Sequence, residues 1–321
     1  MYKINLFFKF FIKNFLFLLI SIFLLFNLIF NPNILKISWY TFYKKLSNLK
    51  NKFLYYKSPL PSVYSPTNIY LYIVNIPPII NKQKNKIFLY KQGIPVIKII
   101  NKNVYNPTTI AQYGLQKYSY YLLYKKDKYL KEAIRSADWL VENQNLYSGA
   151  WEYNFDFKVP GTDIILKSPW ISAIAQGQSM SLLVRIYYIT KNIKYRKSAE
   201  IALKPFLKKV NEGGILSYFW GRPFYEEYPT NPPSFTLNGF MFSLIGLYDM
   251  AVILKSNTAK TLFNNGIKTL EFILPFYDLG PECDYHLGHT AYHLHHLFVP
   301  KTKVHPAGVI IIPFILYYLK D

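Results

Sequence analysis

Two adjacent carboxylates in an aromatic loop are the residues of this sequence that best suit acid–base chemistry. Glu226 and Glu227 follow Phe224 and Tyr225 and precede Tyr228, in a chain with only 17 acidic residues. A low dielectric and a like-charged neighbour both raise the pKa of a glutamate toward the range that general acid–base catalysis uses. The two side chains could also point apart, with one merely solvated. We favour a functional pair, because it lies in a long loop just before a predicted helix.

A second candidate is a polar stripe on a predicted helix that begins near Trp170. Ser172, Gln176 and Ser179 recur at three- to four-residue spacing, and Gln178 and Arg185 lie two turns apart. Such a stripe could donate hydrogen bonds to sugar hydroxyls. Alternatively, Gln176 and Gln178 are ordinary interhelical hydrogen-bonding residues and Gly177 is a close-packing position. The residues alone favour neither interpretation.

The third candidate is a cluster near the C-terminus that holds all six histidines of the chain, together with two tyrosines: Tyr285, His286, His289, Tyr292, His293, His295, His296 and, further on, His305. Imidazoles at this spacing can share a metal ion, and Glu282, Cys283 and Asp284 lie just upstream. HExxH and similar zinc patterns are absent. We therefore expect no metal, and favour polar contacts to an acidic sugar with tyrosine hydroxyls as proton carriers.

The elements that must position these residues are mostly helical. A three- to four-residue apolar period begins at Asn106, a predicted N-cap with proline at the first helical position, and Asp127 is a predicted cap for the next helix. Paired as hairpins, the helices predict a mainly α fold, an α/α toroid or incomplete barrel of helical hairpins. Two long loops would line a cleft at one end. These loops are residues 144–169 and 210–233. The later helices are expected at 170–190, 195–209, 234–254, 258–275, 285–297 and 306–319.

The part before these helices divides into three predicted regions. Residues 1–33 contain the apolar run Phe15 to Phe30, close to the length that a membrane-spanning helix needs, and lack a signal-peptidase pattern. Residues 34–68 form a basic tether, and 69–104 a small β segment with strands near 69–76, 86–90 and 96–100. Residues 105–321 are the helical domain. We expect a single-pass anchor with this domain on the non-cytoplasmic side, although lysines flank both ends of the apolar run.

The net charge of +21 points to a polyanionic partner: nucleic acid, anionic lipid or an acidic polysaccharide. The lysines are scattered, and no zinc-finger spacing or RNA-binding aromatic pattern occurs, so we do not expect nucleic-acid binding. Cys283 is the only cysteine, which excludes an intrachain disulfide.

Several stretches together resemble the D-glucuronyl C5-epimerase family. The matching segments are NPTTIAQYGL from Asn106, ADWL from Ala137 with GAW from Gly149, WISAIAQGQ from Trp170, EEYPT from Glu226, NGF from Asn238 and LIGLYD from Leu244. They occur in the family's order and cover about residues 90–297.

The resemblance implies inversion of C5 of glucuronic acid within a polysaccharide, giving iduronic acid, without an organic cofactor. It also implies that the catalytic residues are Glu227, Tyr228, Tyr285 and Tyr292. Near the C-terminus the chain departs from the family, because Tyr285 and Tyr292 each begin a Tyr-His-x-x-His. Two assignments of these tyrosines are therefore open, and we favour Tyr292 as the group that faces Glu227 across the sugar.

Epimerisation needs a base on one face of C5, an acid on the other, and stabilisation of the enolate-like intermediate. Arg185 and Arg222 are the candidates that could pair with the substrate carboxylate. The full set of expected substrate-binding residues is Trp170, Gln176, Gln178, Arg185, Arg222, Glu226, Asn238, His289, His293 and His296. A polysaccharide lyase, which removes the same proton, and a non-catalytic glycan-binding protein are the rival interpretations. A homodimer is left open.

Overall fold

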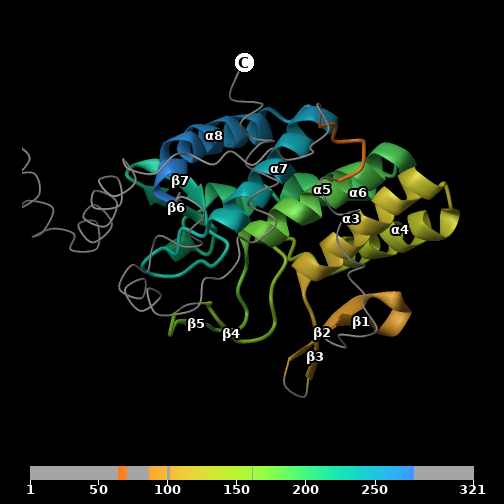
Figure 1. Cartoon of the computed structure of the whole chain (residues 1–321), viewed down its shortest axis with the longest axis horizontal. Coiled ribbons are helices and arrows are strands. Elements are labelled where there is room, and N and C mark those ends of the chain that lie inside the picture. Colours follow the sequence, from red (N-terminus) through yellow and green to blue (C-terminus); the bar gives the residue numbers. More distant parts are fainter. Residues whose placement is uncertain (1–63, 71–86, 100–101, 161, 278–321) are drawn as a thin grey trace, which may run out of the picture. The chain divides into compact units, whose positions relative to one another are not determined.

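The computed structural model describes residues 64–70, 87–99, 102–160 and 162–277, which are coloured in Figure 1. Within these residues the chain is mainly helical and forms three consecutive hairpins. They pair α3 (Pro107–Tyr124) with α4 (Asp127–Glu142), α5 (Ala173–Thr190) with α6 (Ile193–Ile201), and α7 (Leu237–Ile253) with α8 (Asn257–Tyr277). Residues 125–126, 191–192 and 254–256 connect the members of each pair, and such short connections make the two helices antiparallel.

The hairpins form two layers. The first helices of the pairs contact one another, α3 with α5 and α5 with α7, while α4, α6 and α8 pack on their own partners. Burial follows from this arrangement. Helix α5 is buried continuously from Ala173 to Ile186, whereas α4 buries only one face, through Ala133, Ser136, Ala137 and Leu140. The inner helices are therefore apolar on most sides and the outer ones amphipathic.

Helices α5 and α7 approach each other through two glycines. A Cβ on Gly177 would overlap the backbone of Phe242 and Ser243, and one on Gly246 would overlap the backbone of Gly177. Only residues without side chains allow backbones to pack so closely. The interpretation of Gly177 as a close-packing position is thus confirmed.

A three-stranded antiparallel sheet precedes the helices. Strand β2 (Pro95–Ile99) lies between β1 (Ile87–Leu89) and β3 (Lys102–Tyr105), and β2 contacts α3. The strands expected near 86–90 and 96–100 are confirmed within a residue, and β3 was not expected. The strand expected at 69–76 lies largely outside the described residues.

Helix boundaries followed local chemistry that was only partly foreseen. The Asn106 cap is confirmed, since its side chain accepts a hydrogen bond from the Thr109 N–H at 3.0 Å. Asp127 is the first residue of α4 rather than its cap, a position that Lys126 occupies. The helix expected at 195–209 was wrong in extent: α6 ends at Ile201, and a separate 3₁₀ helix, η2 (Lys204–Leu207), follows with Pro205 inside it. The helices expected at 285–297 and 306–319 lie outside the described residues.

The two long loops each contain a β hairpin. Strands β4 (Phe157–Lys158) and β5 (Ile165–Leu166) belong to the loop between α4 and α5. A short 3₁₀ helix, η3 (Val210–Glu212), precedes β6 (Leu216–Phe219) and β7 (Arg222–Tyr225) in the loop between α6 and α7. A further 3₁₀ turn, η1 (Lys91–Gly93), connects β1 to β2. In the part of the chain that is described, no helix has the length and apolarity needed to cross a membrane; the predicted anchor, residues 1–33, lies outside it.

Candidate functional site

The two long loops meet at one end of the helical hairpins. Each hairpin begins and ends at the same end, so the segments that join one hairpin to the next must gather there. These segments are residues 143–172 and 202–236, and Figure 1 shows β6 and β7 at the left of the helices and β4 and β5 at their lower left. The expected clustering of the long loops is therefore present.

Glu227 lies between the N-termini of two inner helices. The Gly239 N–H, in the first turn of α7, donates to the Glu227 carboxylate at 2.7 Å. The Ser172 hydroxyl, directly before α5, donates to the Glu227 carbonyl at 2.6 Å, and the Ala173 N–H donates to the Glu226 carbonyl at 2.9 Å. A helix N-terminus favours negative charge, so α7 stabilises the Glu227 carboxylate.

Glycine at position 239 makes this contact possible. A Cβ there would overlap the Cβ and Cγ of Glu227. Glu227 is 5% exposed, whereas Glu226 is fully buried. The two adjacent carboxylates thus have different surroundings, and Glu227 is the one that keeps an opening to solvent.

Glu226 is held by three donors inside the protein. Its carboxylate accepts from the Ser217 hydroxyl at 2.5 Å, the Ser234 hydroxyl at 2.8 Å and the Phe235 N–H at 3.0 Å. Burial raises the pKa of Glu226 from 4.5 to about 7, against the opposing effect of these hydrogen bonds. With no exposed surface and its acceptors occupied, Glu226 is not placed to bind substrate, which corrects that expectation.

An aromatic wall stands beside Glu227. Tyr153 stacks on Trp170 with ring centroids 4.0 Å apart, and Phe157 stacks on Tyr228 at 5.6 Å and on Trp170 at 5.5 Å. The Trp170 indole N–H donates to the Phe155 carbonyl at 2.9 Å. Trp170 also pairs with Tyr153 through two backbone hydrogen bonds, which is why α5 starts at Ala173 and not near residue 170 as expected. The two loops are therefore joined by stacked rings that include Tyr228.

Tyr153 was not foreseen as part of this site. Its hydroxyl lies 2.6 Å from the Thr108 hydroxyl, and burial and then the nearby Glu227 charge raise its pKa well above the usual range. A tyrosine so placed stays protonated at neutral pH. The only sequence signal was its place in an aromatic loop, three residues after Ala150 and just beyond the family-like Gly-Ala-Trp.

Gln176 has a structural role. Its side-chain carbonyl accepts from the Trp151 N–H at 3.1 Å, and its amide donates to the carbonyls of Gly149 and Ala202 at 3.1 and 3.0 Å. Gln178 is buried as well, at 1% exposed. Their burial agrees with the alternative that Gln176 and Gln178 are ordinary interhelical residues. Neither is placed to touch a sugar.

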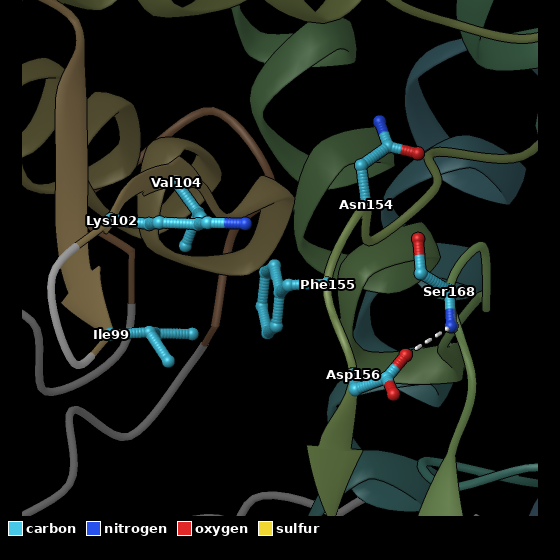
Figure 2. A pocket seen from close by; sticks show the side chains of 7 residues that line it. All are labelled: Ile99, Lys102, Val104, Asn154, Phe155, Asp156 and Ser168. Atoms are coloured by element: carbon cyan, nitrogen blue, oxygen red, sulfur yellow. Dashed lines mark hydrogen bonds between the residues drawn. The ribbon is translucent and has the colours of Figure 1, made fainter.

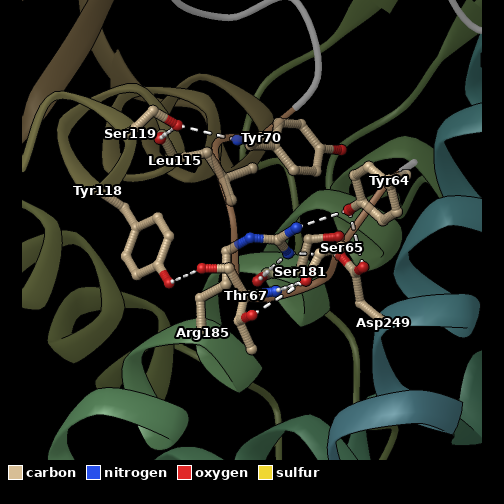
Figure 3. Close-up of polar contacts among 10 residues, drawn as sticks. All are labelled: Tyr64, Ser65, Thr67, Tyr70, Leu115, Tyr118, Ser119, Ser181, Arg185 and Asp249. Atoms are coloured by element: carbon tan, nitrogen blue, oxygen red, sulfur yellow. Dashed lines mark hydrogen bonds and ion pairs between the residues drawn. The ribbon is translucent and has the colours of Figure 1, made fainter. Parts of the chain in front are cut away.

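Arg185 is also internal, which corrects its assignment as a ligand of the substrate carboxylate. Figure 3 shows its guanidinium between Asp249 on α7 and Tyr64, which comes from the segment before the sheet. It forms a fully buried ion pair with Asp249 and donates to the Tyr64 hydroxyl at 2.6 Å, and that hydroxyl in turn donates to Asp249 at 2.8 Å. The Tyr70 ring lies 5.0 Å from the guanidinium. The network ties residues 64–70 to α5 and α7.

Two expected substrate-binding residues, Arg222 and Asn238, have no internal hydrogen-bonding role like that of Gln176 or Arg185 among the described residues. Arg222 is exposed, with its guanidinium carbon 4.6 Å from the centre of the Phe272 ring. Asn238 is partly buried beside Gly239, and its side-chain oxygen has no hydrogen bond within the described ranges.

The C-terminal candidates lie outside the described residues: Tyr285, His289, Tyr292, His293 and His296. The expected approach of Tyr292 to Glu227 therefore stays a prediction. Among residues 64–70, 87–99, 102–160 and 162–277, no group of three His, Cys, Asp or Glu side chains could hold a metal ion. All six histidines lie beyond these ranges, so the expectation of no metal stays a prediction too.

A pocket of about 480 Å³ opens between the β2–β3 hairpin and the loop of the aromatic wall. Figure 2 shows Ile99, Lys102 and Val104 on the hairpin side and Phe155 projecting toward them. Asn154, Asp156 and Ser168 complete the lining. Sequence reasoning missed this pocket, because its two sides lie some 50 residues apart along the chain.

Comparisons with known proteins identify relatives of this chain. A curated D-glucuronyl C5-epimerase from Caenorhabditis elegans is 36% identical over 200 residues, which cover 55% of this chain and 32% of that protein. An uncharacterized protein of Methanocaldococcus jannaschii is 28% identical over 208 residues, covering 56% and 65% of the two chains. The chain thus spans about a third and just under two thirds of these relatives.

Two solved structures show limited similarity. One is a family 76 glycoside hydrolase from a bovine Bacteroides thetaiotaomicron strain, with a TM-score of 0.49 and 17% identity over 74% of this chain and 49% of that one. The other is a family 76 α-mannanase from Bacteroides thetaiotaomicron, with a TM-score of 0.47 and 18% identity over 71% and 59%. The family described as D-glucuronyl C5-epimerase C-terminus matches residues 144–302, the region that contains both loops of the site. Over this region, just under half of the chain, the sequence is that of the D-glucuronyl C5-epimerase family.

Proposed function

We propose that this chain inverts C5 of D-glucuronosyl units in an acidic polysaccharide and so forms L-iduronosyl units. The observation that carries the proposal is the setting of Glu227, which is held at the N-terminus of α7 beside Tyr228 and the aromatic wall. The family match over residues 144–302 supports the same reaction.

The reaction requires removal of the C5 proton from one face and its return to the other. In our proposal Glu227 exchanges a proton with one face of C5, because a carboxylate fixed by the Gly239 N–H has one defined direction of approach. Tyr228, next to Glu227 in the chain, is the second proton carrier on that side. A Tyr292 hydroxyl on the opposite face completes the pair, as the family resemblance implies. Arg222 is the cation that pairs with the substrate carboxylate as negative charge develops on it.

Substitution of the two central residues tests this proposal. Glu227→Gln keeps an acceptor for the Gly239 N–H, and Tyr228→Phe keeps the stacked ring, so both variants should fold normally. General acid–base groups contribute about a hundredfold or more to turnover. We expect losses of at least about that size, measured as incorporation of solvent deuterium at C5 of a glucuronic acid polysaccharide.

Matched controls and alternative outcomes make the test decisive. Glu200→Gln, on the exposed face of α6, should leave exchange unchanged. Near-normal exchange in both Glu227→Gln and Tyr228→Phe would disprove the assignment. Ultraviolet absorbance from an unsaturated uronate would identify a lyase instead. Polysaccharide binding with no exchange in the unaltered protein would identify a glycan-binding protein.

We also propose that two further helices, predicted at 285–297 and 306–319, extend the two layers toward an α/α toroid. The support is the regular order of the layers, in which α3, α5 and α7 are inner helices and α4, α6 and α8 outer ones. An experimentally determined structure that places the C-terminal helices away from α7 and α8 would contradict this.

The apolar run Phe15 to Phe30 supports a further proposal, that the chain is attached to a membrane through residues 1–33. Detergent-free fractionation of the full chain and of a chain without these residues tests it. Recovery of both in the same fraction would disprove the anchor.

A further inference from the structure

The pocket in Figure 2 has the composition of a site for an acidic sugar. Ile99, Val104 and the ring of Phe155 supply apolar surface, which suits the C–H face of a sugar ring. The exposed Asn154 and Ser168 add polar groups at the edge. Pockets that bind small molecules combine an apolar lining with a few polar groups that fix orientation.

The pocket has one cation without an ion-pair partner among the described residues, the Lys102 ammonium group. The Asp156 carboxylate is already occupied, since it accepts from Lys167 at 2.7 Å and from the Ser168 N–H at 3.0 Å, and these bonds lower its pKa. Lys102 takes part in none of the ion pairs found within the described ranges. Its ammonium group is thus the charge that a ligand would meet, and a carboxylate is its natural partner.

Strand register explains why Lys102, and not another lysine of the hairpin, faces the pocket. Lys102 pairs with Ile99, and Val104 pairs with Ile97, so these four side chains share one face of the sheet. Lys98 pairs with Asn103 and lies on the opposite face. Lys98 and Lys102 are both exposed.

The pocket also shares a wall with the candidate active site. The Phe155 ring packs edge-on against Trp170 and Tyr153, at 6.3 and 5.7 Å, and Trp170 contacts Tyr228 at 6.3 Å. Trp170 further donates to the Phe155 carbonyl. A polymer with one unit at Glu227 could therefore extend along this wall into the pocket.

We propose that this pocket binds a second uronic acid unit of the same polysaccharide, with Lys102 paired to its carboxylate and Phe155 packed on its ring. This inference rests on the proposed function for the identity of the polymer. It adds a subsite, remote from the reacting carbon, that selects chains with a uronate on both sides of an intervening sugar.

Binding measurements on the full chain test the subsite separately from catalysis. The probes are oligosaccharides of alternating glucuronic acid and N-acetylglucosamine, from two to ten sugars, and the same oligosaccharides with their carboxyl groups reduced to alcohols. Calorimetry gives Kd for the unaltered protein and for Lys102→Ala, Lys102→Glu, Lys102→Arg and, as matched controls, Lys98→Ala and Lys98→Glu.

Lys102→Ala should weaken binding of the longer acidic oligosaccharides about threefold, and Lys102→Glu about tenfold or more, consistent with a partly exposed ion pair. Lys102→Arg should restore most of the affinity, and the Lys98 variants should change Kd less than twofold. The Lys102 effect should disappear with the disaccharide and the reduced probes, and it should shrink from about 50 mM to about 500 mM salt.

The possible contrary results distinguish failure of the subsite from failure of the proposed function. Equal losses in Lys98→Glu and Lys102→Glu would mean that only net charge matters. A Lys102 effect that persists with reduced probes would exclude a carboxylate partner, and the absence of any binding would exclude a uronate site. Binding that depends on Lys102 in a protein without deuterium exchange would leave the subsite standing and refute the proposed epimerase. Normal deuterium exchange with no effect of the Lys102 substitutions on Kd would refute the subsite and leave the proposed epimerase standing.

Discussion

The buried carboxyl group of Glu226 offers a sharp test of how burial and hydrogen bonding compete at this site. Glu226→Gln replaces it with a neutral group of the same shape. The glutamine carbonyl can accept from the Ser234 hydroxyl and the Phe235 N–H, and its amide can donate to the Ser217 hydroxyl. The substitution thus removes the ionisable group and keeps the contacts.

The size of the effect follows from the pKa. Burial raises the pKa of Glu226 from 4.5 to about 7, and each pKa unit corresponds to about 1.4 kcal/mol. Below about pH 4.5 the carboxyl is protonated in both states, and its contribution to stability is fully present. Between about pH 4.5 and pH 7 only the unfolded chain releases the proton, so the free energy of unfolding falls as pH rises. At pH 8 the loss should total about 3 kcal/mol.

Urea unfolding followed by tryptophan fluorescence at pH 4.5, 5, 6, 7 and 8 measures this effect. The difference in unfolding free energy between Glu226→Gln and the unaltered protein cancels the titration of other groups. We expect the unfolding free energy of Glu226→Gln, relative to that of the unaltered protein, to rise by about 3 kcal/mol between pH 4.5 and pH 8.

A second variant separates the effect of the charge from the effect of lost hydrogen bonds. Glu226→Leu removes the acceptor of the buried Phe235 N–H. The Ser217 and Ser234 hydroxyls keep only their other acceptors, the carbonyls of Phe224 and Tyr228. This loss should cost about 1–3 kcal/mol at every pH. If the difference between Glu226→Gln and the unaltered protein does not change with pH, the three hydrogen bonds hold the carboxylate ionised despite its burial. The reasoning from burial would then be refuted.

Two further substitutions test the support of the site. Gly239→Ala should lower turnover at least about tenfold, because its Cβ would displace the Glu227 side chain, and misplacement of a catalytic group by about 1 Å is costly. Gly221→Ala is the control: its Cβ meets nothing within 4 Å, so the φ of +78° should cost about 1–2 kcal/mol of stability but leave turnover of the folded protein unchanged. Equal deuterium exchange in the two variants would contradict the role of Gly239. Asp249→Asn should lower the free energy of unfolding by about 3–5 kcal/mol in urea titrations, because it leaves the Arg185 charge buried and unpaired. Glu200→Gln, which breaks an exposed pair, should cause no measurable change, and an equally small loss for Asp249→Asn would show that Arg185 is not held as described.

The hairpin architecture could be predicted because its signals are local. The apolar spacing in α4 and the Asn106 cap both act within one or two turns of helix, and both are present in the structure. The helix boundary at Trp170 failed for the opposite reason, since Tyr153 draws this residue into a backbone pairing from 17 residues upstream. Contacts of that kind leave no periodic trace in the sequence.

The candidate site shows the same contrast between local signals, which the sequence reveals, and long-range contacts, which it does not. Glu227 and Tyr228 stood out through their residue types, their loop and the family pattern. Arg185 looked equally suitable for a substrate carboxylate, yet its partner is Asp249, an internal acid 64 residues further along the chain. A polar residue on a helix that is buried on all sides has the same spacing as one that faces a ligand. Only the packing of α5 against α7 distinguishes the two.

Helix α5 then explains how loops can hold chemistry that needs a fixed geometry. Its N-terminus binds the backbone of Glu226 and Glu227, through Ala173 and Ser172. Its middle binds the first loop through Gln176, and its Gly177 sets the distance to α7, the helix whose Gly239 holds the Glu227 carboxylate. The polar residues of α5 that were expected to meet the sugar instead fix the two loops relative to each other. A catalytic group on a loop needs such a rigid support, because its position must be maintained to within a fraction of an ångström.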